Sequence, residues 1–487
     1  MLPRPILEED TSRPIYRQLY EHIKECIEVG TLGPGERLPA TRELAGQLGL
    51  NRATVSSAYD LLETAGLING QVGRGSFVTA GGSRTPGIDW SALLPPGSQR
   101  TSVSDARISF SNSRPSEFLF PMEAFRDTCN EVIQSSEATN ILQLGSPAGY
   151  APLRRYLLER GREEGVVREG DDILITSGCQ QAFDLLQRTL VAHGETVLLE
   201  DPVYPGLVSV FRRTGANVVG IPVGMNGIDV DHIERVLQRE PARMLVVTAS
   251  FQNPTGTSLP GEDRRRLLQL ARRTGTVLIE NDIYGDLAYR GPRDQTIRQL
   301  DETGDTVLLR SYSKLAFPGL RVGWAIGPAR LIARLTEAKQ ASDLHTDHLA
   351  QAVLLRFAES GRLAAHRQKM LAAGRERLDA ALDACERHLP PGSRFTRPRG
   401  GMNLWITLPE PLDPAELLPK AVREGVSYMP GKHFAVGRSV PGTLRLSFAQ
   451  LPPDDIIAGI ATLGRLFRSE LEQAREQARL DPAPVLV

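Results

Sequence analysis

The sequence predicts a multidomain protein in which a small, mostly helical N-terminal domain precedes a large α/β domain. The chain has 487 residues, more than the roughly 100–200 residues of a single domain. Residues 80–106 contain 12 Gly, Pro or Ser residues in 27 positions and show no sustained period, which is typical of a linker. From residue 107 onward, apolar strand-like runs alternate with amphipathic helical segments, a pattern that indicates βαβ units and a mostly parallel sheet. We therefore expect domains at 1–79 and 107–473, joined by the linker and followed by a C-terminal tail at 474–487.

Composition argues against several classes of protein. The formal net charge is -1, so charge alone indicates neither a nucleic acid nor a membrane surface as a partner. The four cysteines, Cys26, Cys129, Cys179 and Cys385, lie far apart and form no CxxC pair. This spacing argues against a disulfide framework and against a metal site, and it is typical of a reducing compartment. No apolar run reaches the length of a membrane span, and the N-terminus has no apolar export segment, so we expect a cytoplasmic protein.

The first 79 residues have the order of elements of a winged helix-turn-helix. Apolar residues recur on one face of a first helix, PIYRQLYEHIKECIEVG. A second, shorter helix follows in TRELAGQLGL with Thr41 as its N-cap, and Asn51 caps a third helix in RATVSSAYDLLETAG. The glycine-rich stretch GLINGQVGRGSFV then predicts a two-stranded hairpin, the wing. Such a fold places its third helix in the major groove of DNA.

The stretches LPATRELAGQLGLNRATVSSAYDLLETAGLI and GRGSFV resemble the GntR family of bacterial repressors, across residues 11–79. The resemblance implies that the domain binds double-stranded DNA. The side chains that it assigns to the DNA are Arg42, Asn51, Arg52, Thr54 and Ser56, with Arg74 and Gly75 at the tip of the wing. Arginine can bind guanine acceptors or phosphates, and hydroxyl groups suit phosphate oxygens. Many relatives carry a further arginine where Ser56 stands, so fewer side chains here can contact bases.

The charge of this domain leaves a second interpretation open. Residues 1–79 carry 8 Lys or Arg against 10 Asp or Glu, whereas a DNA-binding domain usually has a basic surface. Arg37, Arg42, Arg52 and Arg74 would have to gather on one face. Otherwise the domain is an ordinary soluble helical module. The order of the motifs favours DNA binding.

The stretch SYSKLAFPGLRVGW (311–324) sets one lysine among groups that suit a phosphate-bearing aldehyde. Lys314 follows an apolar strand-like run, Ser311 and Ser313 are its close neighbours, and Arg321 lies beyond a Pro-Gly turn. Hydroxyl groups and a guanidinium can bind a phosphate while the amine forms an imine with an aldehyde. Pyridoxal 5'-phosphate carries both groups, and we expect it as the cofactor.

Further polar residues follow the ends of other predicted strands, which is where open α/β sheets bind ligands. The cofactor ring needs a carboxylate opposite its nitrogen, donors for its oxygen, an aromatic neighbour, and a helix N-terminus for its phosphate. The candidates are Asp282 for the ring nitrogen, Asn253 and Tyr284 for the ring oxygen, Tyr204 for stacking, and Ser177, Gly178 and Cys179 for the phosphate. Each alone has an ordinary explanation as a helix cap, a turn or a core residue, and only together do they indicate a site.

In this order and spacing the fragments resemble the fold type I aminotransferases of class I/II, from about residue 107 to 470. The resemblance implies a large α/β domain that binds pyridoxal phosphate and a smaller α+β C-terminal lobe. It implies that Lys314 forms the internal aldimine and serves as the general base, with Asp282 and Tyr284 beside it. It also implies that Arg445, on the strand-like run TLRLSF, binds the α-carboxylate of a substrate; the alternative is a surface ion pair.

Two positions in the large domain depart from this pattern or leave it open. Leu144 stands where many aminotransferases have a tyrosine that reaches the cofactor phosphate of the neighbouring subunit. Leucine cannot do so, and we expect weaker cofactor binding and less efficient transamination. Arg114 is either a second anion-binding side chain or a surface residue.

A GntR-type domain joined by a linker to an aminotransferase-like domain resembles the MocR subfamily of bacterial regulators, over nearly the whole chain. This implies a homodimer that binds paired DNA half-sites and responds to an amino compound, or to pyridoxal phosphate itself. The alternative is an enzyme, a transaminase converting an amino acid to a 2-oxo acid, with an appended DNA-binding domain. The fusion favours the regulator.

Overall fold

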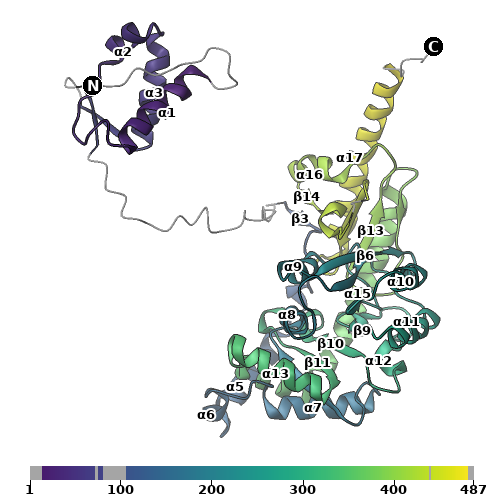
Figure 1. Cartoon of the computed structure of the whole chain (residues 1–487). Helices are drawn as coiled ribbons and strands as arrows, with labels where there is room; N and C mark the ends of the chain where they lie inside the picture. The colour runs from purple at the N-terminus through teal and green to yellow at the C-terminus, as the bar shows by residue number, and fades with distance from the viewer. Residues whose placement is uncertain (1–13, 72–74, 80–105, 438–439, 481–487) are drawn as a thin grey trace. The chain divides into compact units, whose positions relative to one another are not determined.

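The structure is a computed structural model that describes residues 14–71, 75–79, 106–437 and 440–480 (Figure 1). The chain divides into two compact units, residues 1–102 and 103–487. Nearly all of the expected linker and the wing residue Arg74 lie outside the described residues.

The N-terminal unit has the predicted order of three helices and a hairpin. Its elements are α1 (Ile15–Glu28), α2 (Thr41–Leu48), α3 (Arg52–Thr64), β1 (Ile68–Gln71) and β2 (Gly75–Val78). The two strands pair antiparallel. Leu19 and Ile23 of α1 pack against Leu44 of α2 and against Val55 and Leu62 of α3, and these side chains are buried. The winged helix-turn-helix predicted from the sequence is therefore the fold of this unit.

The helix caps of this unit differ in one respect from the prediction. Asn51 caps α3 as expected, because its Oδ1 accepts a hydrogen bond of 3.0 Å from the amide of Ala53. Thr41 is not an N-cap: it is the first residue inside α2, and Ala40, in an extended conformation, stands at the cap position. No side chain therefore caps α2.

An eight-stranded sheet forms the centre of the C-terminal unit, in the order β4-β11-β10-β9-β8-β5-β6-β7. The strands are β4 (Asp171–Thr176), β5 (Thr196–Asp201), β6 (Asn217–Gly224), β7 (Gly227–Ile228), β8 (Met244–Val247), β9 (Val277–Asn281), β10 (Val307–Ser311) and β11 (Gly323–Pro328). The five central strands from β10 to β6 run parallel. Strands β11 and β4 on one side and β7 on the other are antiparallel to their neighbours. The mostly parallel sheet predicted from the alternating pattern is confirmed.

Helices cover both faces of this sheet, and the strands are accordingly apolar on both faces. On one face, Leu309 of β10 and Ile279 of β9 pack with α8 (Cys179–Leu190), α9 (Pro205–Arg213) and α13 (Ala329–Asp343). On the other, Leu278 of β9 packs with α10 (Val230–Leu237), α11 (Gly261–Thr274) and α12 (Ile297–Leu300). The remaining helices of this lobe are α5 (Met122–Ile133), α6 (Ala138–Ile141), α7 (Ala151–Glu163), α14 (His348–Glu359) and the 3-10 turns η1 (Glu117–Leu119), η2 (Gly285–Leu287), η3 (Tyr312–Lys314) and η4 (Pro318–Leu320).

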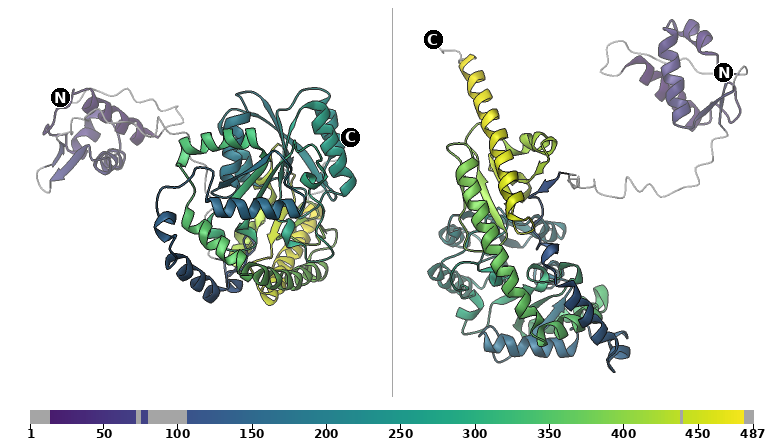
Figure 2. Two further views of the ribbon diagram at one scale, coloured as in Figure 1. Left: turned by 90° about the horizontal axis from the view of Figure 1, so that it is seen from below. Right: turned by 180° about the vertical axis from the view of Figure 1, so that it is seen from behind.

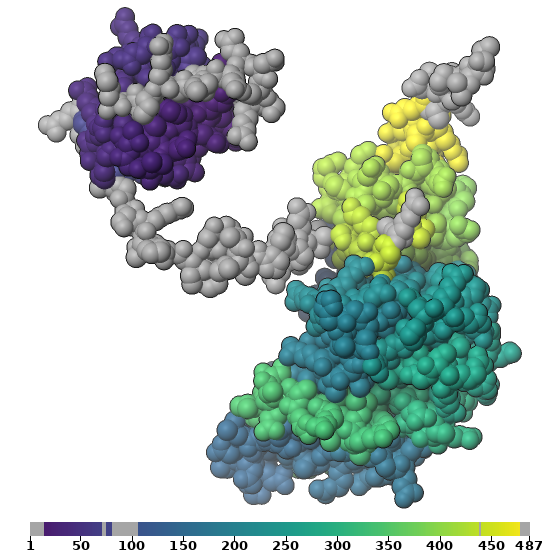
Figure 3. All heavy atoms as spheres, viewed as in Figure 1, coloured from purple at the N-terminus to yellow at the C-terminus, as the bar shows by residue number. Residues whose placement is uncertain are grey.

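A smaller α+β lobe packs directly against the large one (Figure 3). Its antiparallel sheet has the order β12-β13-β16-β15. Its elements are β3 (Ile108–Ser109), β12 (Arg394–Phe395), β13 (Asn403–Thr407), β14 (Val426–Ser427), β15 (Met429–Pro430), β16 (Thr443–Ser447), η5 (Gly431–Phe434), α15 (Arg362–His388), α16 (Pro414–Arg423) and α17 (Pro453–Leu480). The long helices α15 and α17 lie side by side (Figure 2). Strand β3, the first of the unit, pairs parallel with β14.

The start of the expected C-terminal tail is helical. The sequence AREQARL (474–480) belongs to α17, because it consists of good helix formers and the next proline is Pro482. In the described parts of the chain, no helix is both long and apolar enough to cross a membrane.

Candidate cofactor site and DNA-binding surface

Most of the side chains singled out in the large domain line one cavity of about 500 Å³. They are Cys179, Tyr204, Asn253, Tyr284, Ser311, Ser313, Lys314, Arg321 and Arg445. Except for Arg445, which comes from β16 of the small lobe, they follow the carboxyl ends of β4, β5, β8, β9, β10 and η4. The cavity therefore lies where parallel sheets present their loops to a ligand, between the two lobes of the C-terminal unit.

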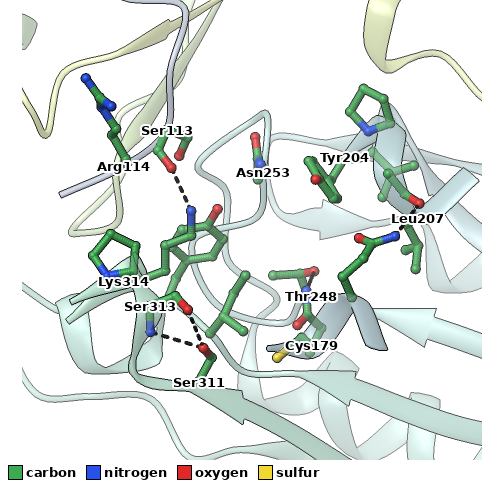
Figure 4. A pocket seen from close by; sticks show the side chains of 18 of the residues that line it. Ser113, Arg114, Cys179, Tyr204, Leu207, Thr248, Asn253, Ser311, Ser313 and Lys314 are labelled. Atoms are coloured by element: carbon green, nitrogen blue, oxygen red, sulfur yellow. Dashed lines mark hydrogen bonds between the residues drawn. The ribbon is translucent and has the colours of Figure 1, made fainter. Parts of the chain in front are cut away.

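Lys314 points into this cavity (Figure 4). Its Nζ donates a hydrogen bond of 2.6 Å to the carbonyl oxygen of Ser113 and lies 5.5 Å from the centroid of the Tyr284 ring. The local sequence explains this position. Ser311 caps the short turn η3 by accepting a hydrogen bond of 3.0 Å from the amide of Ser313, and this turn places Lys314 beyond the end of β10.

One end of the cavity collects groups that bind phosphate. Helix α8 begins at Cys179, and the hydroxyls of Ser311 and Ser313, 2.8 Å apart, lie close to it. Arg321 Nη2 donates to the carbonyl oxygen of Ser177 at 3.4 Å. Gly178 has a φ of 74°, which favours glycine, and a Cβ atom there would also displace Arg321 Nη2, 2.4 Å away. Helix amides, hydroxyls and a guanidinium thus meet at one point, which suits a phosphate dianion. Ser177 and Gly178 do not line the cavity themselves.

Cys179 is not a reactive thiol. Burial raises its pKa to about 12, and its Sγ lies 3.4 Å from the carbonyl oxygen of Arg310. The thiol therefore stays protonated at neutral pH, and the residue contributes the amide that opens α8.

Arg445 is a buried cation that faces the cavity. Its Nη1 donates to Asn253 Oδ1 at 3.0 Å, its Nη2 donates to the carbonyl of Ser111, and its Nε has no partner. Burial lowers its pKa to about 10, and the ring of Phe434 lies 4.9 Å from its Cζ. Among the described residues no carboxylate lies within 4.0 Å of it. A buried guanidinium without a counter-ion is a binding site for a ligand carboxylate.

The acid expected to face the cofactor ring lies elsewhere. Asp282 does not line the cavity; Asn281, the residue before it, does. The Asp282 carboxylate is 3 % exposed and forms ion pairs with Arg310 and Arg293 behind the cavity. Successive residues of a strand point to opposite faces of the sheet, so the pattern in TVLIEND could have shown that only one of the two reaches the cavity. The Asp282 carboxylate therefore lies outside the cavity in which the cofactor ring is expected.

Arg114 and Leu144 both lie at the surface. Arg114 is exposed at the cavity and donates from Nε to Gln450 Oε1 at 2.8 Å. Leu144 is 74 % exposed and does not line this cavity. It lies with Leu142, His345 and other residues around a separate depression of the surface.

The candidate DNA-binding side chains of the N-terminal unit are at its surface. Arg42 on α2 and Arg52 at the start of α3 are exposed, and Thr54 and Ser56 are partly exposed. Asn51 is exposed, with its Oδ1 engaged in the cap. Gly75 begins β2. Arg37, one of the four arginines expected on the DNA-binding face, lies beside the wing, because a Cβ atom on Gly75 would lie 3.0 Å from Arg37 Nε.

Two family models match the chain. One described as "Aminotransferase class I and II" matches residues 115–463, and one described as "Bacterial regulatory proteins, gntR family" matches residues 15–78. YdfD of Bacillus subtilis, an uncharacterized HTH-type transcriptional regulator, is 30% identical over 470 residues, which are 93% of this chain and 96% of YdfD. The chain belongs to the MocR-type family of regulators.

Other relatives match this regulator over one or both units. MocR of Rhizobium meliloti, a probable rhizopine catabolism regulatory protein, is 27% identical over 476 residues, 95% of each chain. Aromatic-amino-acid aminotransferase 1 of Thermococcus litoralis is 35% identical over 372 residues, 75% of this chain and 89% of its own. The crystal structure of kynurenine aminotransferase from Pyrococcus horikoshii has a TM-score of 0.75 and 33% identity, over 80% of this chain and 99% of its own.

Pyridoxal 5'-phosphate is the cofactor of this regulator's aminotransferase domain, and the cavity fits it with one exception. The volume, the phosphate-binding end and the primary amine of Lys314 all suit it. When bound, the cofactor supplies an aldehyde carbon that takes up primary amines. The exception is the acid, because no Asp or Glu is among the described residues that line the cavity.

Proposed function

We propose that this MocR-type regulator binds pyridoxal phosphate at Lys314 and that an amino compound entering the same cavity, or the cofactor itself, changes its affinity for DNA. The observation that carries the proposal is the convergence of a lysine amine and a buried, uncompensated guanidinium on one cavity. Lys314 suits the aldehyde and Arg445 suits a carboxylate, so the effector that fits both is an amino acid or a close analogue.

The backbone of residues 111–113 supports a route from the cavity to the DNA-binding domain. Its carbonyl oxygens accept hydrogen bonds from the two cationic side chains of the cavity: Lys314 Nζ bonds Ser113, and Arg445 Nη2 bonds Ser111. This segment follows β3, and the linker to the DNA-binding domain precedes β3 in the chain. A ligand that engages either side chain removes a hydrogen bond from the segment. Ligand binding and the conformation of the segment are therefore thermodynamically linked.

A homodimer completes the proposal, because paired half-sites require two DNA-binding domains related by symmetry. Exposed apolar side chains lie on η1, on α5 and after α6 and α13, and two of them, Leu142 and Leu144, line one depression; they are Phe118, Met122, Ile133, Leu142, Leu144 and Leu344. Exposed apolar groups of this kind mark protein–protein contacts. The second copy of this chain is the partner that we propose for them.

The test is a footprint of the cofactor-loaded protein on the DNA upstream of its own gene and of the neighbouring genes, at physiological salt with excess competitor DNA. We expect protection of two half-sites and a change in protection when amino acids are added. Absence of specific protection, with and without pyridoxal phosphate and amines, would contradict the proposal.

A transaminase is the second candidate, and the buried Arg445 favours it because such an arginine suits an amino-acid substrate. Steady turnover of an amino acid with a 2-oxo acid distinguishes the two. An enzyme continues to form product over many cycles, whereas a sensor binds the amine and stops.

A further inference from the structure

Neighbouring strands set which side chains face the cofactor cavity. In β9, Ile279 belongs to the core that packs against α8, α9 and α13, and Asn281, two residues on, points to the same face. In β10, Leu309 and Ser311 have the same relation. Asn281 and Ser311 both line the cavity. The opposite face at this end of the sheet receives Arg310 and Asp282, which pair with one another.

Asp282 is held on that opposite face by two cations. Arg310 Nε donates to Asp282 Oδ2 at 2.9 Å, and Arg293 Nη2 donates to the same oxygen. Arg310 is fixed in turn by Glu164, and Arg293 by Asp286 at 2.7 Å. The Asp282 carboxylate and these four partners line a second cavity of about 380 Å³. To reach the first cavity, Asp282 would have to give up its ion pairs with both arginines, and breaking the buried pair with Arg310 is unfavourable.

The side-chain amide of Asn281 has only one of its two polar atoms in a hydrogen bond. Its Nδ2 donates to Thr248 Oγ1 at 3.2 Å, and its Oδ1 is buried without a hydrogen-bond partner. A flip of this amide lets Oδ1 accept a hydrogen bond from the Thr248 hydroxyl and turns Nδ2 to the cavity as a donor. An unprotonated ring nitrogen is an acceptor and would be the partner of that donor. Thr248 lines the same cavity, at the end of β8.

We propose that Asn281, and not Asp282, faces the pyridine nitrogen of the bound cofactor, and that this site therefore exchanges amines while giving little proton abstraction. The inference rests on the proposed function. A carboxylate opposite the ring nitrogen favours its protonated, cationic form, which draws electrons from the substrate carbon. An amide has no net charge and does not favour that form.

Amine exchange does not need the ring as an electron sink. The incoming primary amine forms a C=N bond to the aldehyde-derived carbon, the bond from that carbon to Lys314 Nζ breaks, and the two amine protons pass to Nζ, which leaves as a free amine. No oxidant or water is consumed. Removal of the proton from the substrate carbon, the step that leads to transamination, does need the sink. With Asn281 facing the ring nitrogen, the site can bind an amine by exchange while the proton abstraction that leads to transamination stays slow.

The test observes the ring nitrogen directly, by nitrogen NMR of the protein loaded with pyridoxal phosphate that is 15N-labelled in the ring. We expect an unprotonated nitrogen at neutral pH in the unaltered protein and a protonated one in Asn281→Asp, which exchanges one amide group for a carboxylate. Asp282→Asn should leave the nitrogen signal where it is in the unaltered protein. In Asn281→Asp, the half-reaction with an amino acid should accelerate roughly tenfold or more, the effect of about 1.4 kcal/mol on a barrier.

A protonated ring nitrogen in the unaltered protein that becomes unprotonated in Asp282→Asn would overturn the inference and restore Asp282. Equal signals in the unaltered protein and Asn281→Asp would also overturn it, and this comparison stands even if Asp282→Asn fails to fold. Failure to take up pyridoxal phosphate at all would overturn the proposed function together with the inference. Uptake with a protonated ring overturns the inference alone.

Discussion

Arg445 Nη1 donates a hydrogen bond of 3.0 Å to Asn253 Oδ1, and this bond joins a strand of the small lobe to a turn of the large one. Because the oxygen of Asn253 is engaged, its Nδ2 is the group left to donate into the cavity. Arg445 therefore orients Asn253 through Nη1. Its Nε has no hydrogen-bond partner and can bind a ligand.

Arg445→Lys should weaken the binding of amino acids about 10- to 100-fold, since hydrogen bonds to a charged group contribute about 1.5–3 kcal/mol. Lysine retains the charge but not the fork of donors that suits a carboxylate. The measurement is titration of the cofactor's absorption with an amino acid. The control is the amine that lacks the carboxylate, whose affinity should change little; an equal loss for both ligands would remove the carboxylate from the role of Arg445.

Lys314→Ala should keep DNA binding and lose the response to amines. The variant lacks the amine that reaches the cofactor aldehyde and that bonds Ser113. Footprints with and without amine measure the effect. Lys369→Ala, an exposed lysine on α15, is the matched control and should respond as the unaltered protein does. A normal response in Lys314→Ala would exclude amine exchange from the switch.

Arg52→Ala should weaken operator binding by roughly 1–3 kcal/mol if Arg52 contacts a base. Arg52 is exposed at the start of α3, the end of a recognition helix that meets base edges. Lys24→Ala removes the same charge on α1, where Lys24 forms only an exposed ion pair with Glu28 at 3.8 Å. Mobility-shift titrations should separate the two variants, and unchanged affinity in Arg52→Ala would refute its assignment.

Glu200→Gln should flatten the pH dependence of stability. Burial raises the pKa of Glu200 to about 8, against an ordinary value of 4.5. Between these values the folded protein holds a proton that the unfolded chain releases, so the free energy of unfolding falls as pH rises, by at most about 1.4 kcal/mol per pH unit. Glutamine is neutral at every pH. Denaturant unfolding at pH 5 and pH 8 should show the variant gaining relative to the unaltered protein at pH 8; parallel curves would contradict this.

Leu144→Glu should weaken the proposed homodimer. Leu144 is 74 % exposed beside Leu142, and a carboxylate buried between two copies would lack a counter-charge. Sedimentation velocity over a range of concentrations measures the shift towards monomer. Val29→Glu, at an equally exposed apolar position on the N-terminal unit, is the control and should sediment as the unaltered protein does. No shift in Leu144→Glu would exclude this surface from the interface.

The sequence predicted the fold class and most of the residues around the cavity because both are encoded locally. A serine cap, a lysine and a Pro-Gly turn in SYSKLAFPGLRVGW lie within a few residues of one another, and strand ends gather at one edge of a parallel sheet. The position of the Asp282 side chain was not predicted, because its residue type suits the ring nitrogen whereas the alternation of side chains along β9 directs it to the other face of the sheet. Residues 474–480 of the expected tail are helical, in keeping with their helix-forming composition.

Other features could not be read from the sequence, because they depend on contacts between distant segments. The carbonyls of Ser111 and Ser113 carry no side-chain signal, yet they accept hydrogen bonds from residues 201 and 334 positions away. Arg37 comes beside the wing only when the hairpin folds back on the loop before α2. The arginines that hold Asp282 come from β10 and from the loop after η2.

The pairing of β3 with β14 attaches the start of the C-terminal unit to its small lobe. The amides of Ile108 and Phe110 bond the carbonyls of Gly425 and Ser427, and the chain from the DNA-binding domain enters at the N-terminal end of β3. A force along β3 loads both bonds together, in shear, rather than one after the other. The first hydrogen bonds that carry such a load thus belong to the lobe that carries Arg445, and the Ser113–Lys314 bond lies further along the chain.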